Sequence, residues 1–169
     1  HRVAEPTRQL QELPECDPLT GLPNRRHLLV LLENALAAGR RDGRLVTVIF
    51  VNLDNFKNVN DSMGHGFGDE VLKAVSQRLA DAARDIGFAA RLGGDEFTVV
   101  LTGDSDVESA RNAGLKVIAA FHTPISVGNR DLMISVSAGA SIYPDHETTA
   151  EGLLKAADAG LLTKGKRKA

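Results

Sequence analysis

The residues Arg91-Leu92-Gly93-Gly94-Asp95-Glu96 stand between two short apolar runs, at positions 88–90 and 97–101. Two glycines followed by an aspartate are typical of a tight turn, and short apolar runs on either side favour strands. The stretch therefore predicts a β-hairpin whose tip presents two neighbouring carboxylates, Asp95 and Glu96.

Working outward from this hairpin, residues 45–51 (Leu-Val-Thr-Val-Ile-Phe-Val) form a continuous β-branched run. Such a run predicts a strand buried on both faces. Residues 52–68 are polar and punctuated by glycine, so we expect a loop with one helical turn there. Residues 125–127 and 132–142 are expected to pair as a second hairpin around Gly128-Asn129-Arg130.

Apolar residues recur at helical spacing in four segments, which predicts helices at 25–38, 69–84, 104–122 and 149–162. From residue 45 the order is strand, helix, strand, strand, helix, strand. This order predicts an α+β, ferredoxin-like (βαββαβ) core with helices on one face of a central antiparallel sheet, plus an extra C-terminal hairpin and helix. Asn24 is a candidate N-cap for the first helix.

The composition bounds the class of protein. The 169 residues carry 20 Lys+Arg against 22 Asp+Glu, a net charge of −2, which argues against a nucleic-acid binder. A single cysteine, Cys16, forms no internal disulfide, and no apolar run reaches the ~20 residues of a membrane span. We expect a cytoplasmic domain at 16–169, without membrane contact, preceded by a linker or connecting helix at 1–15.

Oxygen-bearing side chains gather where two predicted strands end. Asn52 and Asp54 follow the strand at 45–51 and, two residues apart, share a face if the strand extends to them. If the hairpin pairs beside this strand, Asp95 and Glu96 complete an oxygen-rich pocket of the kind that Mg²⁺ prefers. The alternative is that these acids at strand ends and turn tips are simply solvated.

A segment rich in glycine and capping residues, Asn60-Asp61-Ser62-Met63-Gly64-His65-Gly66-Phe67-Gly68-Asp69, precedes the second predicted helix. A helix entrance of this kind suits an anion or a nucleotide. Guanine presents N1–H and N2–H₂ donors that Asn60 and Asp69 can accept, whereas adenine offers a different edge. This pairing favours guanine.

The stretch from Arg91 to Phe97 resembles the signature of the GGDEF family, the diguanylate cyclases. Further segments resemble motifs of that family in the right order, namely Asp17-Pro18-Leu19-Thr20-Gly21-Leu22-Pro23-Asn24-Arg25, residues 53–61, Gly64-His65, Gly68-Asp69, Ser135-Val136-Ser137-Ala138-Gly139 and Ala156-Ala157-Asp158. The resemblance implies a nucleotidyl-cyclase core that covers nearly the whole domain.

The resemblance also implies a reaction and its residues. The family condenses two GTP molecules into cyclic di-GMP with release of pyrophosphate, each of two facing domains holding one GTP, so a homodimer is implied. Matching positions imply catalytic roles for Asp95, Glu96 and Lys57. They imply GTP contacts for Asn60, Asp69, Phe56, Gly93 and Gly94. They imply Mg²⁺ or Mn²⁺ ligands at Asp95, the Leu53 carbonyl, Asn52 (weakened) and Asp54.

Three positions depart from the family pattern. Asn52 stands where the family usually has a metal-binding Asp, so the site loses one negative charge. Gly165 and Leu162 replace a lysine and a tyrosine of the last helix, where the lysine grips phosphates. The inhibitory product site keeps Arg84, but Gly87 stands where its aspartate partner is expected, which argues against product inhibition there.

Two functions follow from these observations. The first is a diguanylate cyclase-type domain, attenuated by Asn52 and Gly165. The alternative is a GTP-binding regulatory domain that controls an attached phosphodiesterase (EAL) or other output domain. By analogy with the family, a sensory region is expected upstream in the full-length protein.

Overall fold

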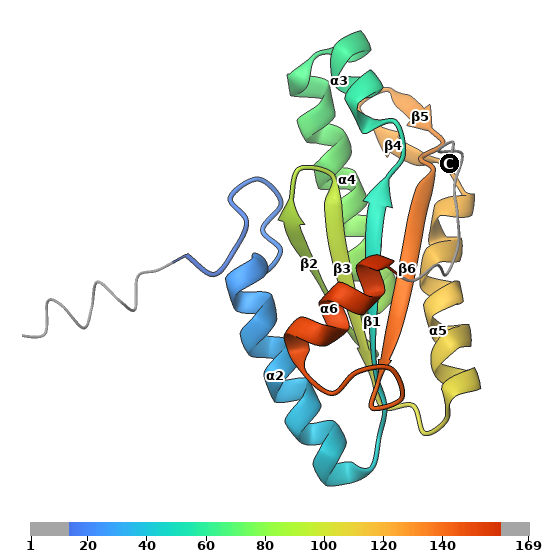
Figure 1. The fold of residues 1–169 in the computed structure, drawn as a ribbon. Helices are drawn as coiled ribbons and strands as arrows, with labels where there is room; N and C mark the ends of the chain where they lie inside the picture. The colour runs from blue at the N-terminus through green and yellow to red at the C-terminus, as the bar shows by residue number, and fades with distance from the viewer. Residues whose placement is uncertain (1–13, 160–169) are drawn as a thin grey trace, which may run out of the picture.

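The computed structural model describes residues 14–159, and Figure 1 shows how its elements are arranged. Among these residues, no helix combines the length and the apolar character needed to cross a bilayer. The elements follow in the order α2 (Arg25–Asp42), β1 (Val46–Leu53), α3 (Phe56–Met63), α4 (His65–Ala83), β2 (Gly87–Gly93), β3 (Glu96–Thr102), α5 (Val107–Ala119), the 3₁₀ turn η1 (Ala120–His122), β4 (Ile125–Val127), β5 (Arg130–Leu132), β6 (Val136–Tyr143) and α6 (Ala150–Ala159).

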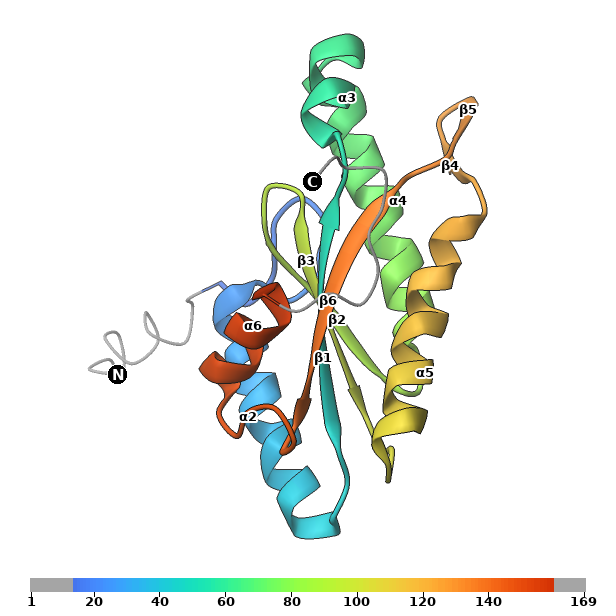
Figure 2. The ribbon, with the colours of Figure 1, turned by 45° about the vertical axis from the view of Figure 1, so that its right-hand side comes forward.

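The main sheet has the strand order β2-β3-β1-β6, and every neighbouring pair is antiparallel. This confirms the α+β, ferredoxin-like arrangement expected from the sequence. The two helices of the βαββαβ core, α4 and α5, lie on one face of the sheet, and α2 and α6 cover the other (Figure 2). The sheet is therefore flanked by helices on both faces. The βαββαβ core accounts for the layer of α4 and α5, and α2 and α6 add a second layer on the opposite face.

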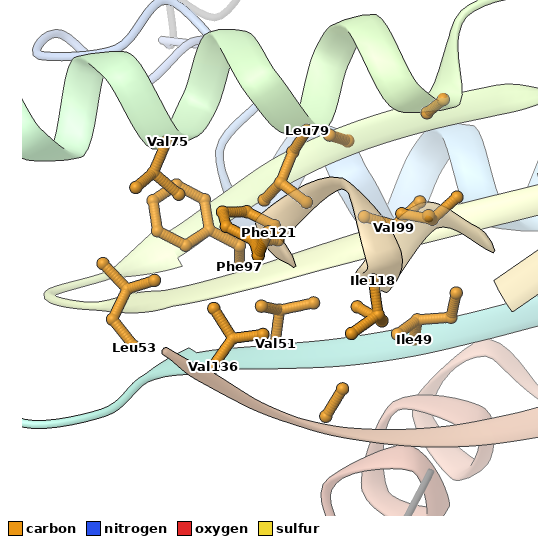
Figure 3. Packing of buried hydrophobic residues seen from close by; sticks show 14 of the residues in the cluster. Ile49, Val51, Leu53, Val75, Leu79, Phe97, Val99, Ile118, Phe121 and Val136 are labelled. Atoms are coloured by element: carbon orange, nitrogen blue, oxygen red, sulfur yellow. The ribbon is translucent and has the colours of Figure 1, made fainter. Parts of the chain in front are cut away.

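The larger core lies between the sheet and the helices α4 and α5 (Figure 3). Alternation along β1 points Ile49, Val51 and Leu53 toward this side, into the same cluster as Val75 and Leu79 of α4. The other face of β1 carries Val46 and Val48, which join a second cluster with α2 and α6. Burial on both faces explains why the strand reads as one continuous apolar run.

Two predicted segments differ from the structure. Residues 52–68 were expected to form a loop with one turn, but β1 runs to Leu53 and two helices, α3 and α4, follow with a break at Gly64. Segment 132–142 was expected to be one hairpin arm, but it divides. Only β4 and β5 form the hairpin, and β6 joins the main sheet beside β1. Because β1 pairs with β3 on one side only, its backbone groups on the other side require hydrogen-bond partners, which β6 provides.

The first helix begins where the sequence predicted. The Asn24 side chain accepts a hydrogen bond from the backbone N–H of His27 at 2.9 Å, as an N-cap does. The helix runs to Asp42, one turn beyond the predicted end at residue 38, and closes on Gly43. The predicted linker at 1–15 falls mainly outside the described residues.

Candidate functional site

The signature hairpin forms as predicted and delivers its tip to the end of β1. Gly94 and Asp95 make the turn between β2 and β3, and Gly94 has a φ of 53°, a left-handed conformation that favours glycine. The backbone N–H of Leu53 donates to the carbonyl oxygen of Asp95 at 3.1 Å. Asn52 pairs with Glu96 in the register of β1 and β3. The two predicted groups of oxygen ligands therefore lie side by side.

Asn52 and Glu96 also share a face of the sheet. Because Val51 and Leu53 point to the α4–α5 side, the intervening Asn52 points to the side of α2 and α6. The Oδ1 atom of Asn52 is buried and has no hydrogen-bond partner. A buried oxygen without a partner is costly, so this atom suits a ligand such as a cation.

Few acidic side chains lie near the hairpin tip and the end of β1. Within residues 14–159, no group of three or more His, Cys, Asp or Glu side chains is placed to hold a metal ion. The described acids at the tip are Asp95, which is half-buried, and Glu96, which is exposed. A cation here would therefore depend on neutral oxygens as well as carboxylates, as the Asn52 substitution implies.

Asp54 is held against the neighbouring strand. Its carboxylate accepts hydrogen bonds from the hydroxyls of Ser135 at 2.9 Å and Ser137 at 2.8 Å. Its backbone N–H donates to the Ser135 carbonyl at 2.9 Å. Asp54 thus ties the end of β1 to the start of β6, although the strand ends at Leu53 and does not extend to Asp54 as the shared-face prediction required. Its contacts favour bracing the Leu53 peptide over binding a cation.

An open cleft of about 570 Å³ lies beside the hairpin on the α2–α6 side. Glu96, Phe50 and Leu92 form one wall, and Arg25 and Lys155 place two cations along its lining. Glu151 and Asp158 add two further carboxylates. Arg25 and Lys155 were not predicted as neighbours of Glu96, because sequence spacing does not show that α2 and α6 meet beside the hairpin.

The predicted guanine contacts come together through a close approach at Gly68. A Cβ atom built on Gly68 would lie 1.8 Å from Oδ1 of Asn60 and 3.4 Å from Cζ of Phe56. The absence of a side chain at Gly68 therefore lets Asn60 of α3 lie directly against α4. Asp69, the residue that follows Gly68 on α4, is exposed. Lys57, on the same short helix, is exposed and pairs with Asp61 at 3.5 Å.

Arg91 connects the hairpin to the segment that precedes α2. One guanidinium nitrogen donates to both carboxylate oxygens of Asp17 at 3.0 Å, and the others donate to the Gly94 carbonyl at 2.8 and 3.2 Å. Burial alone would raise the pKa of the Asp17 carboxyl, but hydrogen bonds from Thr20 and Arg91 outweigh it and hold the pKa below its usual value. Both motifs are visible in the sequence, but their contact is not, because the two residues lie 74 positions apart and no local pattern relates them.

Comparison with known proteins assigns the family. The sequence profile described as "Diguanylate cyclase, GGDEF domain" matches residues 15–169. The chain belongs to the GGDEF family. This confirms the resemblance on which the site residues were assigned.

Solved and curated relatives of the GGDEF domain agree in fold and sequence. The crystal structure of a sensory box/GGDEF family protein from Caulobacter crescentus superposes with a TM-score of 0.81 at 39% identity, covering 88% of this chain and 96% of that one. Diguanylate cyclase DosC of Escherichia coli K12 is 37% identical over 86% of this chain and 32% of its own length. Cyclic di-GMP phosphodiesterase NbdA of Pseudomonas aeruginosa PAO1 is 38% identical over 90% of this chain and 19% of its own length. The chain thus spans about a third or less of these curated relatives.

The predicted inhibitory product positions, Arg84 and Gly87, make local contacts in this GGDEF domain. Arg84 ends α4 and pairs with Asp81 of the same helix. A Cβ atom on Gly87 would lie 1.8 Å from the backbone oxygen of Val100 on β3. The backbone therefore leaves no space for the missing aspartate. The departures at Leu162 and Gly165 lie outside the described residues.

Proposed function

We propose that this GGDEF domain is a diguanylate cyclase-type domain that binds GTP with Mg²⁺ or Mn²⁺ and condenses two GTP molecules into cyclic di-GMP as a homodimer. The observation that carries the proposal is the pairing of Asn52 with Glu96, together with the Leu53–Asp95 hydrogen bond. These contacts support the proposal because they bring Asp95 and Glu96 to the end of β1, beside Asn52 and the Leu53 carbonyl.

The residues of this edge fit a divalent cation. The Asp95 carboxylate, the unpartnered Asn52 Oδ1 and the Leu53 carbonyl are hard oxygen ligands of the kind that Mg²⁺ prefers. When bound, the cation supplies positive charge against the phosphates during phosphoryl transfer. The Asp54–serine contacts hold the Leu53 peptide in place, and Asp54 is assigned to this bracing role.

The remaining residues recognise and activate the nucleotide. Asn60 and Asp69 accept the N1–H and N2–H₂ donors of guanine, and the Phe56 ring packs against the same turn. Lys57, Gly93 and Gly94 border the space for the phosphates. Glu96 accepts the proton of the 3′-hydroxyl as that oxygen attacks the α-phosphorus of the second GTP and pyrophosphate leaves. The second GTP belongs to the second domain of the dimer.

A second candidate function rests on Asn52. A neutral amide in place of a carboxylate weakens cation binding and hence turnover. Guanine recognition by Asn60 and Asp69 does not depend on Asn52. The domain would then bind GTP and control an attached output domain, and its similarity to both a cyclase and a phosphodiesterase is consistent with either role.

Calorimetric titration with GTP and ATP, followed by chromatographic assay of cyclic di-GMP, tests both functions. The cyclase proposal predicts GTP binding that requires Mg²⁺ or Mn²⁺, product formation, and loss of product in Glu96→Gln with binding retained. Asn52→Asp should tighten Mg²⁺ binding and raise turnover. Binding without product, in the wild type and in Asn52→Asp, would support the regulatory function instead.

Nucleotide selectivity provides a separate control. Asp69→Asn replaces one of the two carboxylate oxygens with an NH₂ donor and removes the negative charge, so it should weaken the preference for GTP over ATP. Asp61→Asn, a change to an exposed acid on α3, should leave that preference intact. Equal binding of GTP and ATP by the wild type would refute the guanine assignment.

A further inference from the structure

A second cavity, of about 140 Å³, lies on the opposite face of the sheet from Glu96, between α5 and the strands β1 and β6. Ala110 and Gly114, four residues apart on α5, form its helical wall, and both are buried. Ala140 and Ile142 of β6 form part of its floor. The cavity exists because Ala110 and Gly114 of α5 face Ala140 of β6, and these three residues are too small to fill the space between helix and strand.

One wall of this α5 cavity is polar and incompletely satisfied. Thr47 of β1 lines it, on the same face as Ile49 and Val51, and is only 2% exposed. The Thr47 hydroxyl oxygen is buried and has no hydrogen-bond partner. Buried hydroxyls in folded proteins are almost always paired, so the cavity provides the space for a missing partner.

Two ionisable side chains, Arg111 and His146, line the cavity. Both residues are exposed. The Nδ1 atom of His146 already accepts a hydrogen bond from the Ile142 N–H at 2.9 Å. The interior thus offers an apolar wall and one hydroxyl, without an opposite charge to compensate a buried ion.

We propose that the α5 cavity binds a small uncharged molecule with an apolar body and a single hydroxyl or carbonyl group, which pairs with the Thr47 hydroxyl. The volume is close to the ~150 Å³ of an engineered cavity that holds benzene. It is well below the roughly 300–1,000 Å³ of pockets for larger ligands, which excludes a nucleotide. The site is therefore distinct from the proposed GTP site and independent of it.

Phenol and benzene are the probes, because they match in size and differ by one hydroxyl. Amide chemical shifts of the 169-residue chain, followed during titration with each probe, should show saturable changes around Thr47, Gly114 and Ala140. Phenol should bind roughly five- to tenfold more tightly than benzene, the gain expected from one hydrogen bond to a buried hydroxyl.

Four variants distinguish a ligand site from a packing defect. Thr47→Val removes the hydroxyl at constant shape and should lower phenol affinity to that of benzene, whereas Thr47→Ser should keep the preference. Ala110→Leu fills the cavity and should abolish binding of both probes. Leu115→Ala, an exposed change on α5, should leave binding unchanged.

The absence of saturable shifts in the wild type would overturn the proposal, since the cavity would then hold only water. An unchanged preference for phenol in Thr47→Val would overturn it as well. The Thr47 variants keep the test decisive even if Ala110→Leu fails to fold.

Discussion

Gly68 offers a sharp test of nucleotide recognition, because Gly66 provides a matched control on the same helix. A Cβ atom at Gly68 would lie 1.8 Å from Oδ1 of Asn60, whereas a Cβ atom at Gly66 would meet nothing within 4 Å. Both residues belong to α4, and neither has a left-handed φ. The two Gly→Ala variants therefore differ in the displacement of Asn60.

The expected magnitudes separate stability from binding. Alanine is favoured over glycine in a helix by about 1 kcal/mol, so Gly66→Ala should raise the free energy of unfolding by up to that amount. In Gly68→Ala the same gain is offset by the movement of Asn60, whose amide end is a flexible group that can rotate away. The domain should fold, but Asn60 should no longer reach guanine.

The loss of one hydrogen bond of about 1–1.5 kcal/mol corresponds to roughly a tenfold weaker GTP affinity. Calorimetric titration with GTP, alongside urea unfolding of both variants, measures the two quantities separately. If Gly68→Ala bound GTP as tightly as the wild type, Asn60 would not contact the base. If Gly66→Ala lost affinity equally, the effect would belong to the helix terminus and the reasoning from Gly68 would fail.

Three further predictions concern the contacts around the site. Asp54→Ala removes a carboxylate that accepts hydrogen bonds from two serine hydroxyls, so the free energy of unfolding measured in urea should fall by about 2–3 kcal/mol. The control variant Asp61→Ala should change it little. Asp17 has a lowered pKa, so its stabilising contribution is complete above the ordinary value of 3.8 and disappears as the pH falls through the lower folded value. The stability difference between the wild type and Asp17→Asn should therefore narrow below about pH 4, and a constant difference between pH 7 and pH 3 would contradict this account. Gly87→Ala should destabilise the domain by about 1–3 kcal/mol, because the new methyl group meets the Val100 backbone, and Gly87→Asp should not create cyclic di-GMP binding at Arg84 in a titration with that dinucleotide.

Local sequence signals predicted the parts of the fold that depend on local chemistry. The hairpin turn at Gly94-Asp95, the buried strand around Ile49 and the Asn24 cap are each specified by neighbouring residues, and each appears where it was expected. The segment 52–68 was misjudged because its polar, glycine-containing composition resembles a loop. Its helices instead depend on the packing of Phe56 and Val59 against the main core.

The sequence predicted the motifs of the candidate site, but not the contacts between residues that lie far apart in the chain. Asn52 and Glu96 were expected to lie together if the hairpin paired beside the first strand, and β3 does pair with β1. By contrast, the Arg91–Asp17 contact and the Lys155 wall of the cleft depend on where α2 and α6 dock. The positions of these helices are set by side-chain packing against the sheet, which cannot be predicted from local sequence patterns.

The guanidinium of Arg91 holds the Asp17 carboxylate and the Gly94 carbonyl at once, with its side chain only 11% exposed. A displacement of the segment before α2 cannot leave the signature tip undisturbed, since both are fastened to one rigid planar group. Because the Arg91 backbone N–H also donates to the Pro23 carbonyl at 3.0 Å, side chain and backbone together couple any movement of the segment before α2 to the signature hairpin.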